Sequence, residues 1–487
     1  MMWEEALPII IEWRVFALVV EIVLITGMLF AERDNQNKII VWMLVFLIAP
    51  ILGFIIYLFV GQTFYAEHTF RLKGISDREV KSALHIEDKL IETDEKNMDP
   101  ETVTMVKAIR NIGGASFSNN NDIKLYTEGE DFFDDMLRDI EGARRFIHLE
   151  YYILRNDELG NRFMELITKK AKDGVEVRLL VDSMGLQKGT QKAIKKFVRA
   201  GGDFTTFHKI PVLLLSPKKN NRNHRKLTIV DGDIAYCGGF NIGDEYLGKG
   251  KFGYWRDTAV RIRGGGCIPI SSRFLMDWDY AYTKPFPDIE LGKFIPMTVL
   301  DKWGDDRMQL VSGGPDIAWK NPVRLQYLQM IKMAKKRVWI HTPYLIPNDS
   351  ILDELTLAAA SGVDVRIMIP DRPDHIFVYW NNLHSANRLM EAGVHVYHYH
   401  RGFLHSKTAL VDDSYCSVGS ANIDDRSLVL NFESNAMIYS ERIAKELEAA
   451  YLEDLKYCTE YSCEEYRNRS LGMKIRIGFS RLFRNLS

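Results

Sequence analysis

Two copies of one polar pattern contain the side chains best suited to chemistry. Each copy reads H-x-K-x-x-x-x-D, and the six residues are His224, Lys226, Asp231, His405, Lys407 and Asp412. A G-x-x-N segment follows each copy at the same spacing, and its asparagines are Asn241 and Asn422. Such a pattern arises at about 1 in 10,000 positions, so two matching copies indicate function rather than two ordinary core histidines. Histidine beside lysine suits nucleophilic and acid–base catalysis on an anionic substrate.

A β-strand would position each histidine and lysine together. Side chains alternate along a strand, so His224 and Lys226 are expected on one face, with Leu227 and Ile229 on the other. The same alternation applies to the second copy. The aspartates fall at the strand ends, where a supporting role is expected, and each G-x-x-N segment is interpreted as a tight return that brings the amide back towards the lysine.

The two copies belong to a longer internal repeat. Residues 143–154 are echoed by 335–346, residues 174–182 by 362–371, and residues 223–231 by 404–412, always in the same order. Each unit alternates short β-branched runs with helical stretches, which predicts two α/β halves with mixed or parallel sheets. An approximate two-fold axis between the halves would bring equivalent strands face to face.

With these motifs the sequence resembles the phospholipase D superfamily from about residue 122 to 461, and within it the bacterial cardiolipin synthases. The second resemblance rests on segments 49–58, 221–226, 254–258 and 309–315. One departure, interpreted as minor, is Gly238-Gly239 in the first half, where the superfamily often has Gly-Ser. The second half keeps Gly419-Ser420.

The resemblance implies a two-histidine phosphatidyl transfer. His224 would be the nucleophile and His405 the general acid and base, although the symmetry of the halves leaves the choice open from residue types alone. Asp257 and Glu433 would orient the rings across the interface between the halves, Glu433 with His224 and Asp257 with His405.

The expected reaction joins two phosphatidylglycerols into cardiolipin and releases glycerol. Lys226, Lys407, Asn241 and Asn422 would surround the phosphate oxygens. The sequence has no H-E-x-x-H motif and no clustered carboxylates, so neither a metal nor another cofactor is expected. A phospholipase D hydrolase, an endonuclease and a phosphatidylserine synthase are the alternatives. A binding protein with a dead site is disfavoured because both motifs are intact.

The N-terminus is expected to enter a membrane. Residues 39–60 are apolar and uncharged, long enough to span about 30 Å of hydrocarbon. Residues 9–31 form a second stretch interrupted by Glu12, Arg14 and Glu21, so residues 1–62 are predicted to be a transmembrane hairpin. Residues 63–114 would be a helical connector, 115–308 and 309–465 the two halves, and 466–487 a basic amphipathic tail. Basic residues after the second span favour a multi-pass cell-membrane enzyme with a cytoplasmic catalytic part.

Composition narrows the partners. The net charge of −2 argues against nucleic acid, so phosphatidylglycerol and other anionic membrane lipids are the expected partners, and a homo-oligomer is left open. A basic cluster around the first motif was interpreted as drawing in anionic headgroups; its residues are Lys218, Lys219, Arg222 and Arg225. The five cysteines match no zinc pattern and are expected to be free thiols.

Overall fold

The computed structural model describes residues 36–49, 97–208, 221–282, 291–315, 321–372 and 374–480, together with residues 19, 22, 23, 25–27, 52, 53 and 57. The chain divides into two compact units, residues 1–75 with 210–220 and residues 76–209 with 221–487. In the first unit, helix α2 (Gln36–Ile48) holds Trp42 and Phe46 in edge contact with Tyr57. None of the described helices has both the length and the apolar character that a membrane span requires. Most of the predicted hairpin, including Glu21, lies outside the described residues.

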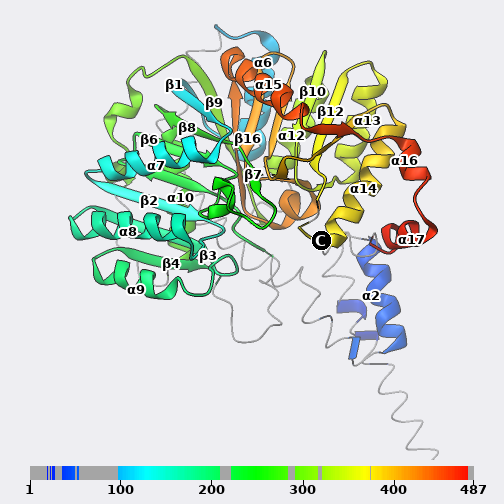
Figure 1. The fold of residues 1–487 in the computed structure, drawn as a ribbon, viewed down its shortest axis with the longest axis horizontal. Helices are drawn as coiled ribbons and strands as arrows, with labels where there is room; N and C mark the ends of the chain where they lie inside the picture. The colour runs from blue at the N-terminus through cyan, green and yellow to red at the C-terminus, as the bar shows by residue number, and fades with distance from the viewer. Residues whose placement is uncertain are drawn as a thin grey trace, which may run out of the picture. The chain divides into compact units, whose positions relative to one another are not determined.

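The second unit contains both halves, and each half builds a mixed sheet with the same strand order (Figure 1). In the first half the order is β1 (Phe117–Tyr126), β8 (Ala259–Arg263), β6 (Ile234–Gly238), β5 (Leu227–Val230), β2 (Phe146–Tyr151), β3 (Glu176–Asp182) and β4 (Asp203–Phe207). In the second half it is β9 (Asp306–Gly313), β18 (Glu433–Tyr439), β16 (Tyr415–Gly419), β15 (Thr408–Val411), β10 (Arg337–His341), β12 (Asp364–Pro370), β13 (His395–Tyr399) and the added β19 (Cys458–Glu460). The predicted α/β halves are therefore confirmed.

The two sheets join edge to edge, which the sequence did not predict. Strand β1 pairs antiparallel with β9, so the described strands of both halves form one 15-stranded sheet. Strand β6 also packs against β16 and β18, so the central strands face each other as expected. Each half thus contributes equivalent strands to one shared interface.

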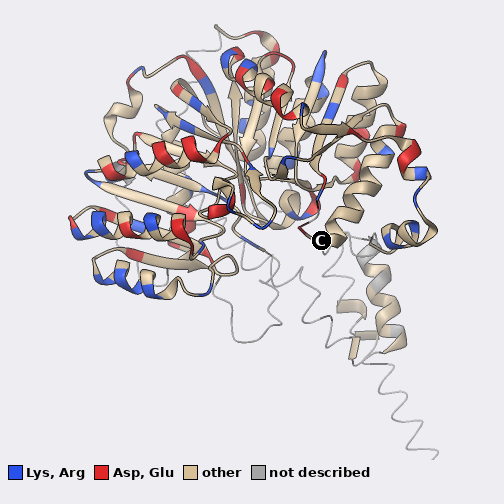
Figure 2. Cartoon of the chain, in the orientation of Figure 1, with Lys and Arg blue, Asp and Glu red and all other residues tan. Residues whose placement is uncertain are grey.

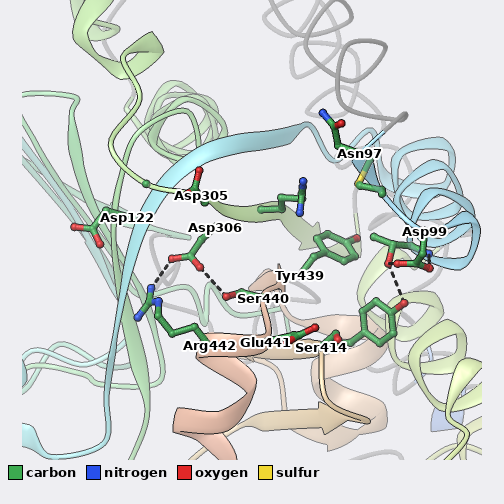
Figure 3. Close-up of a pocket in the computed structure, with 15 residues that line it drawn as sticks. Asn97, Asp99, Asp122, Asp305, Asp306, Ser414, Tyr439, Ser440, Glu441 and Arg442 are labelled. Carbon is green, nitrogen blue, oxygen red and sulfur yellow. Dashed lines mark hydrogen bonds and ion pairs between the residues drawn. The ribbon is translucent and has the colours of Figure 1, made fainter.

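Asp306, at the start of β9, stabilises this junction (Figure 3). Its carboxylate accepts hydrogen bonds from the Ile123 main-chain N–H at 3.2 Å and from Ser440 Oγ at 2.6 Å. It also pairs with Arg442, on the helix that follows β18. One buried acid therefore connects β1 of the first half to β9 and the α15 region of the second.

Helices cover both faces of each sheet. Those of the first half and the preceding connector are α6 (Pro100–Gly113), α7 (Gly129–Gly142), α8 (Glu158–Lys172), α9 (Gln191–Arg199), α10 (Cys267–Ala281) and α11 (Leu291–Phe294). Those of the second half and the tail are α12 (Pro322–Met333), α13 (Asp349–Ala360), α14 (Ile376–Glu391), α15 (Glu441–Leu455), α16 (Cys463–Arg467) and α17 (Leu471–Ser480). Each half has its own apolar core of strand and helix side chains.

Local signals in the sequence set the ends of several helices. Asp99 caps α6 by accepting from the N–H groups of Glu101 and Thr102, Pro100 occupies the first turn, and Gly114 ends the helix at φ 62°. Asp157 caps α8 through the Gly160 N–H at 2.9 Å. Helix α6 lies at the end of the predicted helical connector.

Candidate active site

Main-chain pairing between the halves positions both histidines. The His224 N–H donates to the Phe432 carbonyl at 2.9 Å, and the His405 N–H donates to the Arg256 carbonyl at 2.8 Å. In the second case a short parallel pair, β14 (Gly402–Leu404) with β7 (Tyr254–Arg256), leads directly into the histidine. Each histidine therefore lies opposite the residue just before a carboxylate of the other half, Phe432 before Glu433 and Arg256 before Asp257. The histidines themselves come before β5 and β15, not within a strand as the alternation argument expected.

Each ring is held by a carboxylate from the opposite half. His224 Nδ1 lies 3.0 Å from Glu433 Oε2, and His405 Nδ1 lies 2.6 Å from Asp257 Oδ2. Both carboxylates are fully buried. A carboxylate on Nδ1 fixes the tautomer and the orientation of an imidazole, which leaves Nε2 as the nitrogen for chemistry.

Aromatic rings pack against both imidazoles. The Tyr152 ring meets the His224 ring edge-on at 5.1 Å between centroids, and Trp255 lies 5.2 Å from the His405 ring. Burial dominates the electrostatics of the rings: it lowers the pKa of His224, and together with Lys407 it lowers the pKa of His405 to about 3. Both rings are therefore neutral near pH 7 without substrate, the form that a histidine nucleophile requires.

The two lysines are buried beside the rings. Lys226 Nζ donates to the His224 carbonyl at 2.5 Å, and Lys407 Nζ donates to the His405 carbonyl and lies 4.0 Å from Asp257 Oδ2. Burial lowers the pKa of Lys226 to about 7 and that of Lys407 to about 8, although nearby carboxylates favour the charged forms. Such partly compensated cations are suited to stabilising a bound phosphate anion.

The carboxylates stay ionised despite their burial. Burial alone would raise the pKa of Glu433, but the opposing effects of His224 and Lys226 and the Ser420 hydroxyl hold it below the ordinary value. For Asp257, Lys407 and His405 likewise outweigh burial and lower the pKa. The described site thus holds two acids, two lysines and two neutral imidazoles in one buried cluster.

The asparagines do not occupy equivalent places. Asn241 accepts from the Ile153 N–H at 3.0 Å and donates to the Tyr246 hydroxyl at 3.1 Å, and that hydroxyl lies 3.5 Å from His405 Nδ1. Asn422 donates to Asp424 at 3.2 Å, while its own side-chain oxygen is buried without a hydrogen-bond partner among the described residues. The two amides therefore have different hydrogen-bond partners in the two halves.

The motif aspartates lie at sharp turns away from the rings. Asp231 has φ 52°, and its carboxylate accepts from the N–H groups of Arg144, Arg145 and Phe146 at 2.7–3.0 Å. Asp412 has φ 50° and accepts from the equivalent N–H groups that lead into β10. Both aspartates tie the end of the motif strand to the start of its neighbour.

The Gly239 and Ser420 positions explain the departure from the superfamily pattern. The Ser420 hydroxyl donates to Glu433 Oε2 at 2.5 Å, and its carbonyl lies 3.0 Å from His224 Nδ1. At Gly239 an added Cβ would come within 1.9 Å of Asp257 Oδ1. The interpretation of this difference as minor is therefore wrong, because the glycine gives Asp257 its space. Gly239 and Ser420 occupy equivalent positions of the repeat, and this correspondence in the sequence could have indicated that the two residues should be compared.

Two residues of the basic cluster around the first motif, Arg222 and Arg225, are buried and not exposed as a headgroup-binding role requires. Arg225 is 1% exposed, and its guanidinium pairs with Asp277 at 2.6 Å and donates to the Gly313 carbonyl at 2.8 Å. It therefore connects the halves from inside the protein and cannot draw in headgroups. Arg222 is also buried and lies 3.5 Å from Asp182, whereas Lys218 and Lys219 lie outside the described residues.

The cysteines are free thiols, as expected. Cys237, Cys267 and Cys416 are buried, and Cys458 and Cys463 are partly exposed.

Comparison with known proteins identifies the class. A family profile described as "Cardiolipin synthase, PLD-like domain" matches residues 136–251 and 327–455, and one described as "Phospholipase_D-nuclease N-terminal" matches residues 15–62. The fold resembles the crystal structure of phosphatidylserine synthase from Haemophilus influenzae Rd KW20, with a TM-score of 0.60 and 15% identity over 78% of this chain and 99% of that one. The fold and the paired histidines place the chain among the phospholipase D-like proteins.

Relatives narrow this class to one family. A cardiolipin synthase of Staphylococcus aureus is 41% identical, with 93% of this chain and 92% of the relative covered. A cardiolipin synthase of Clostridium perfringens is 40% identical, with 93% and 94% covered. The chain belongs to the bacterial cardiolipin synthase family of phospholipase D-like enzymes.

Proposed function

We propose that this enzyme transfers a phosphatidyl group from one phosphatidylglycerol to another and forms cardiolipin and glycerol. The arrangement that carries the proposal is the pair of histidines, each held at Nδ1 by a buried acid of the other half and each beside a buried lysine. Membership of the cardiolipin synthase family supplies the phospholipid substrate class.

In the first step, Nε2 of neutral His224 attacks the phosphorus of the donor lipid. The bond from phosphorus to the glycerol oxygen breaks, His405 gives that oxygen a proton, and a phosphatidyl group remains on His224. Lys226 and Lys407 stabilise the charge on the non-bridging oxygens. In the second step, a hydroxyl of another phosphatidylglycerol loses its proton to His405 and attacks the phosphorus, and the bond to Nε2 breaks.

The acid role requires His405 to gain a proton before the first step. Without substrate, burial and Lys407 keep the ring neutral. A phosphodiester anion bound between the lysines offsets their charge and raises the affinity of His405 for a proton. Proton uptake on lipid binding therefore accompanies the reaction, and calorimetry in buffers of different ionisation enthalpy measures it.

A product assay tests the proposed reaction directly. Purified enzyme is given phosphatidylglycerol vesicles with excess EDTA, and the lipid products and released glycerol are measured by mass spectrometry. Cardiolipin with matching glycerol is expected, with none from His224→Ala or His405→Ala. Phosphatidic acid as the main product would instead mean that water is the acceptor and would refute the transferase assignment.

Trapping the intermediate tests which histidine is the nucleophile. Phosphatidylglycerol radiolabelled at its phosphorus is mixed with enzyme, which is then denatured in alkali and digested. We expect the label on the peptide that contains His224. Label on the His405 peptide would reverse the two roles while leaving the transfer chemistry intact.

The enzyme is membrane-associated, and we propose that residues 1–62 form a two-helix anchor with the catalytic unit in the cytoplasm. The uncharged run of residues 39–60 and the match of residues 15–62 to the N-terminal family profile support the anchor. Cysteine substitutions in the polar turn of residues 32–38 and in the catalytic unit, labelled with an impermeant reagent in intact cells, test the orientation. Labelling of the catalytic unit alone would contradict it.

A further inference from the structure

A groove with a one-sided charge lies between α8 and α9, outside the active site. It has a volume of about 1020 Å³, and Glu165 is the one acid among the described residues that line it. Its basic residues all come from α9, and they are Lys192, Lys195, Lys196 and Arg199. Figure 2 shows these cations gathered along α9.

The sequence of α9 separates its charge from its buried face. Ile194 is 7% exposed and Phe197 is fully buried, and both pack into the core of the first half. At about 100° per residue, the four cations fall within a sector of about 100° centred opposite these two residues. The exposed side of α9 is therefore a continuous basic strip, with the apolar Val198 exposed beside it.

Within the described part of the chain, the four cations make no ion pair. Some exposed lysines of the same half do form ion pairs, such as Lys249 with Glu158 at 2.5 Å and Lys293 with Glu176 at 2.7 Å. Four neighbouring cations without counter-ions repel one another, so an anionic partner is favoured at this surface.

The two segments that lead into α8 and α9 come from the catalytic site along the chain. Asn156 lines the groove three residues after Ile153, whose N–H donates to Asn241. The segment that leads into α9 starts at Asp182, which accepts from the N–H of Asn223 at 2.9 Å, beside the catalytic His224. The chain therefore links the groove to the active site through two short segments.

We propose that the groove between α8 and α9 docks the catalytic unit on the anionic bilayer surface, with its basic strip on phosphatidylglycerol headgroups. This docking surface rests on the proposed function, which makes an anionic lipid the substrate. Each lysine or arginine near such a surface contributes about 1 kcal/mol, or about fivefold in affinity. The groove would hold the active site over its substrate once the chain is at the membrane.

Hydrogen exchange of the full chain in nanodiscs tests the docking surface without relying on activity. The discs contain phosphatidylcholine alone or phosphatidylcholine mixed with phosphatidylglycerol. We expect slower exchange in the peptide of residues 187–200 with the mixed lipid, and loss of this difference at high salt. Equal exchange in both discs would overturn the proposal. Equal slowing by inorganic phosphate with phosphatidylcholine discs would overturn it in favour of a soluble anion.

Two matched triple variants separate a local effect from a change in net charge. The groove variant carries Lys192→Gln, Lys195→Gln and Arg199→Gln. The control carries Lys332→Gln, Arg388→Gln and Lys445→Gln, which are exposed on α12, α14 and α15. Only the groove variant should lose the lipid-dependent slowing, and its KM for phosphatidylglycerol should rise by at least about fivefold with kcat unchanged. Equal exchange and equal KM in the two variants would refute the docking surface. Lipid-dependent slowing of exchange in a wild-type enzyme that forms no cardiolipin would refute the proposed reaction alone.

Discussion

Replacing Glu433 by glutamine removes the charge that holds the proposed nucleophile and keeps the shape of the side chain. The carboxylate lies 3.0 Å from His224 Nδ1 and also accepts from Ser420. His224 becomes positively charged when it carries the phosphatidyl group, so the carboxylate stabilises the intermediate and the transition state more than the free ring. A neutral amide cannot supply that difference.

The expected fall in kcat can be worked out from the distance between the Glu433 carboxylate and the His224 ring. Unit charges 3.0 Å apart attract by about 5.5 kcal/mol at an effective dielectric constant of about 20, which sets an upper value near 10⁴-fold. A hydrogen bond to a charged group contributes about 1.5–3 kcal/mol, which sets a lower value of about tenfold to 150-fold. We therefore expect Glu433→Gln to lower kcat by about 10- to 10⁴-fold.

The assay measures cardiolipin formation at saturating phosphatidylglycerol for the wild type, Glu433→Gln and the matched control Glu446→Gln. Glu446 is exposed on α15 and pairs with Arg442 at 2.8 Å, so its loss should leave kcat unchanged. Circular dichroism and thermal unfolding check that each variant folds. A folded Glu433→Gln enzyme with kcat within about threefold of the wild type would refute the role of the carboxylate.

Three further predictions concern stability and pH. Burial lowers the pKa of Lys226 to about 7 and that of Lys407 to about 8, so above these pH values the unfolded chain binds more protons than the folded chain. The free energy of unfolding should therefore rise with pH up to about 10.5, by at most about 1.4 kcal/mol per pH unit for each lysine. In Lys226→Met/Lys407→Met the free energy of unfolding, measured by thermal unfolding, should depend less on pH. Equal slopes for variant and wild type would contradict the burial argument. Wild-type kcat/KM should fall above pH 8 as the lysines lose their charge. Asp231→Ala should lower the free energy of unfolding by about 2–4 kcal/mol, because three main-chain N–H groups lose their acceptor. The kcat per folded molecule should be retained. A normal unfolding midpoint with lost kcat would instead mean that Asp231 takes part in the reaction. Arg225→Ala should lower the free energy of unfolding by about 3 kcal/mol, because buried Asp277 loses the closer of two arginine partners and keeps Arg273 at 3.2 Å. Arg225→Met/Asp277→Leu should recover part of this loss, and no recovery would show that the loss lies elsewhere.

The sequence predicted the two halves and the chemistry of the motifs because both depend on repetition and residue type. The strand order within each half was not predicted, but it is the same in both halves, as expected for two related units. The edge-to-edge pairing of β1 with β9 could not be predicted, because it depends on which strand edges remain unpaired after each half has folded.

Burial overrides residue type at several positions, and there the sequence alone misleads. Arg225 was taken for a surface cation, but Asp277, about fifty residues later in the chain, makes its burial tolerable. The basic strip of α9 was overlooked because its cations alternate with Ile194 and Phe197, and only the helix separates them. At Gly239 the absence of a side chain is what matters, because it leaves room for the carboxylate of Asp257.

The exchange of acids between the halves has a consequence for each half taken alone. Neither half holds a complete histidine–carboxylate pair, since Glu433 serves His224 and Asp257 serves His405. Each half therefore supplies the acid that the other half needs, so the chain is arranged like a dimer of two related units joined in one polypeptide. The two pairs differ in detail, since Asp257 lies against Gly239 whereas Glu433 accepts from Ser420. Two separately expressed halves would restore activity only by reassembling, and each alone would be inert.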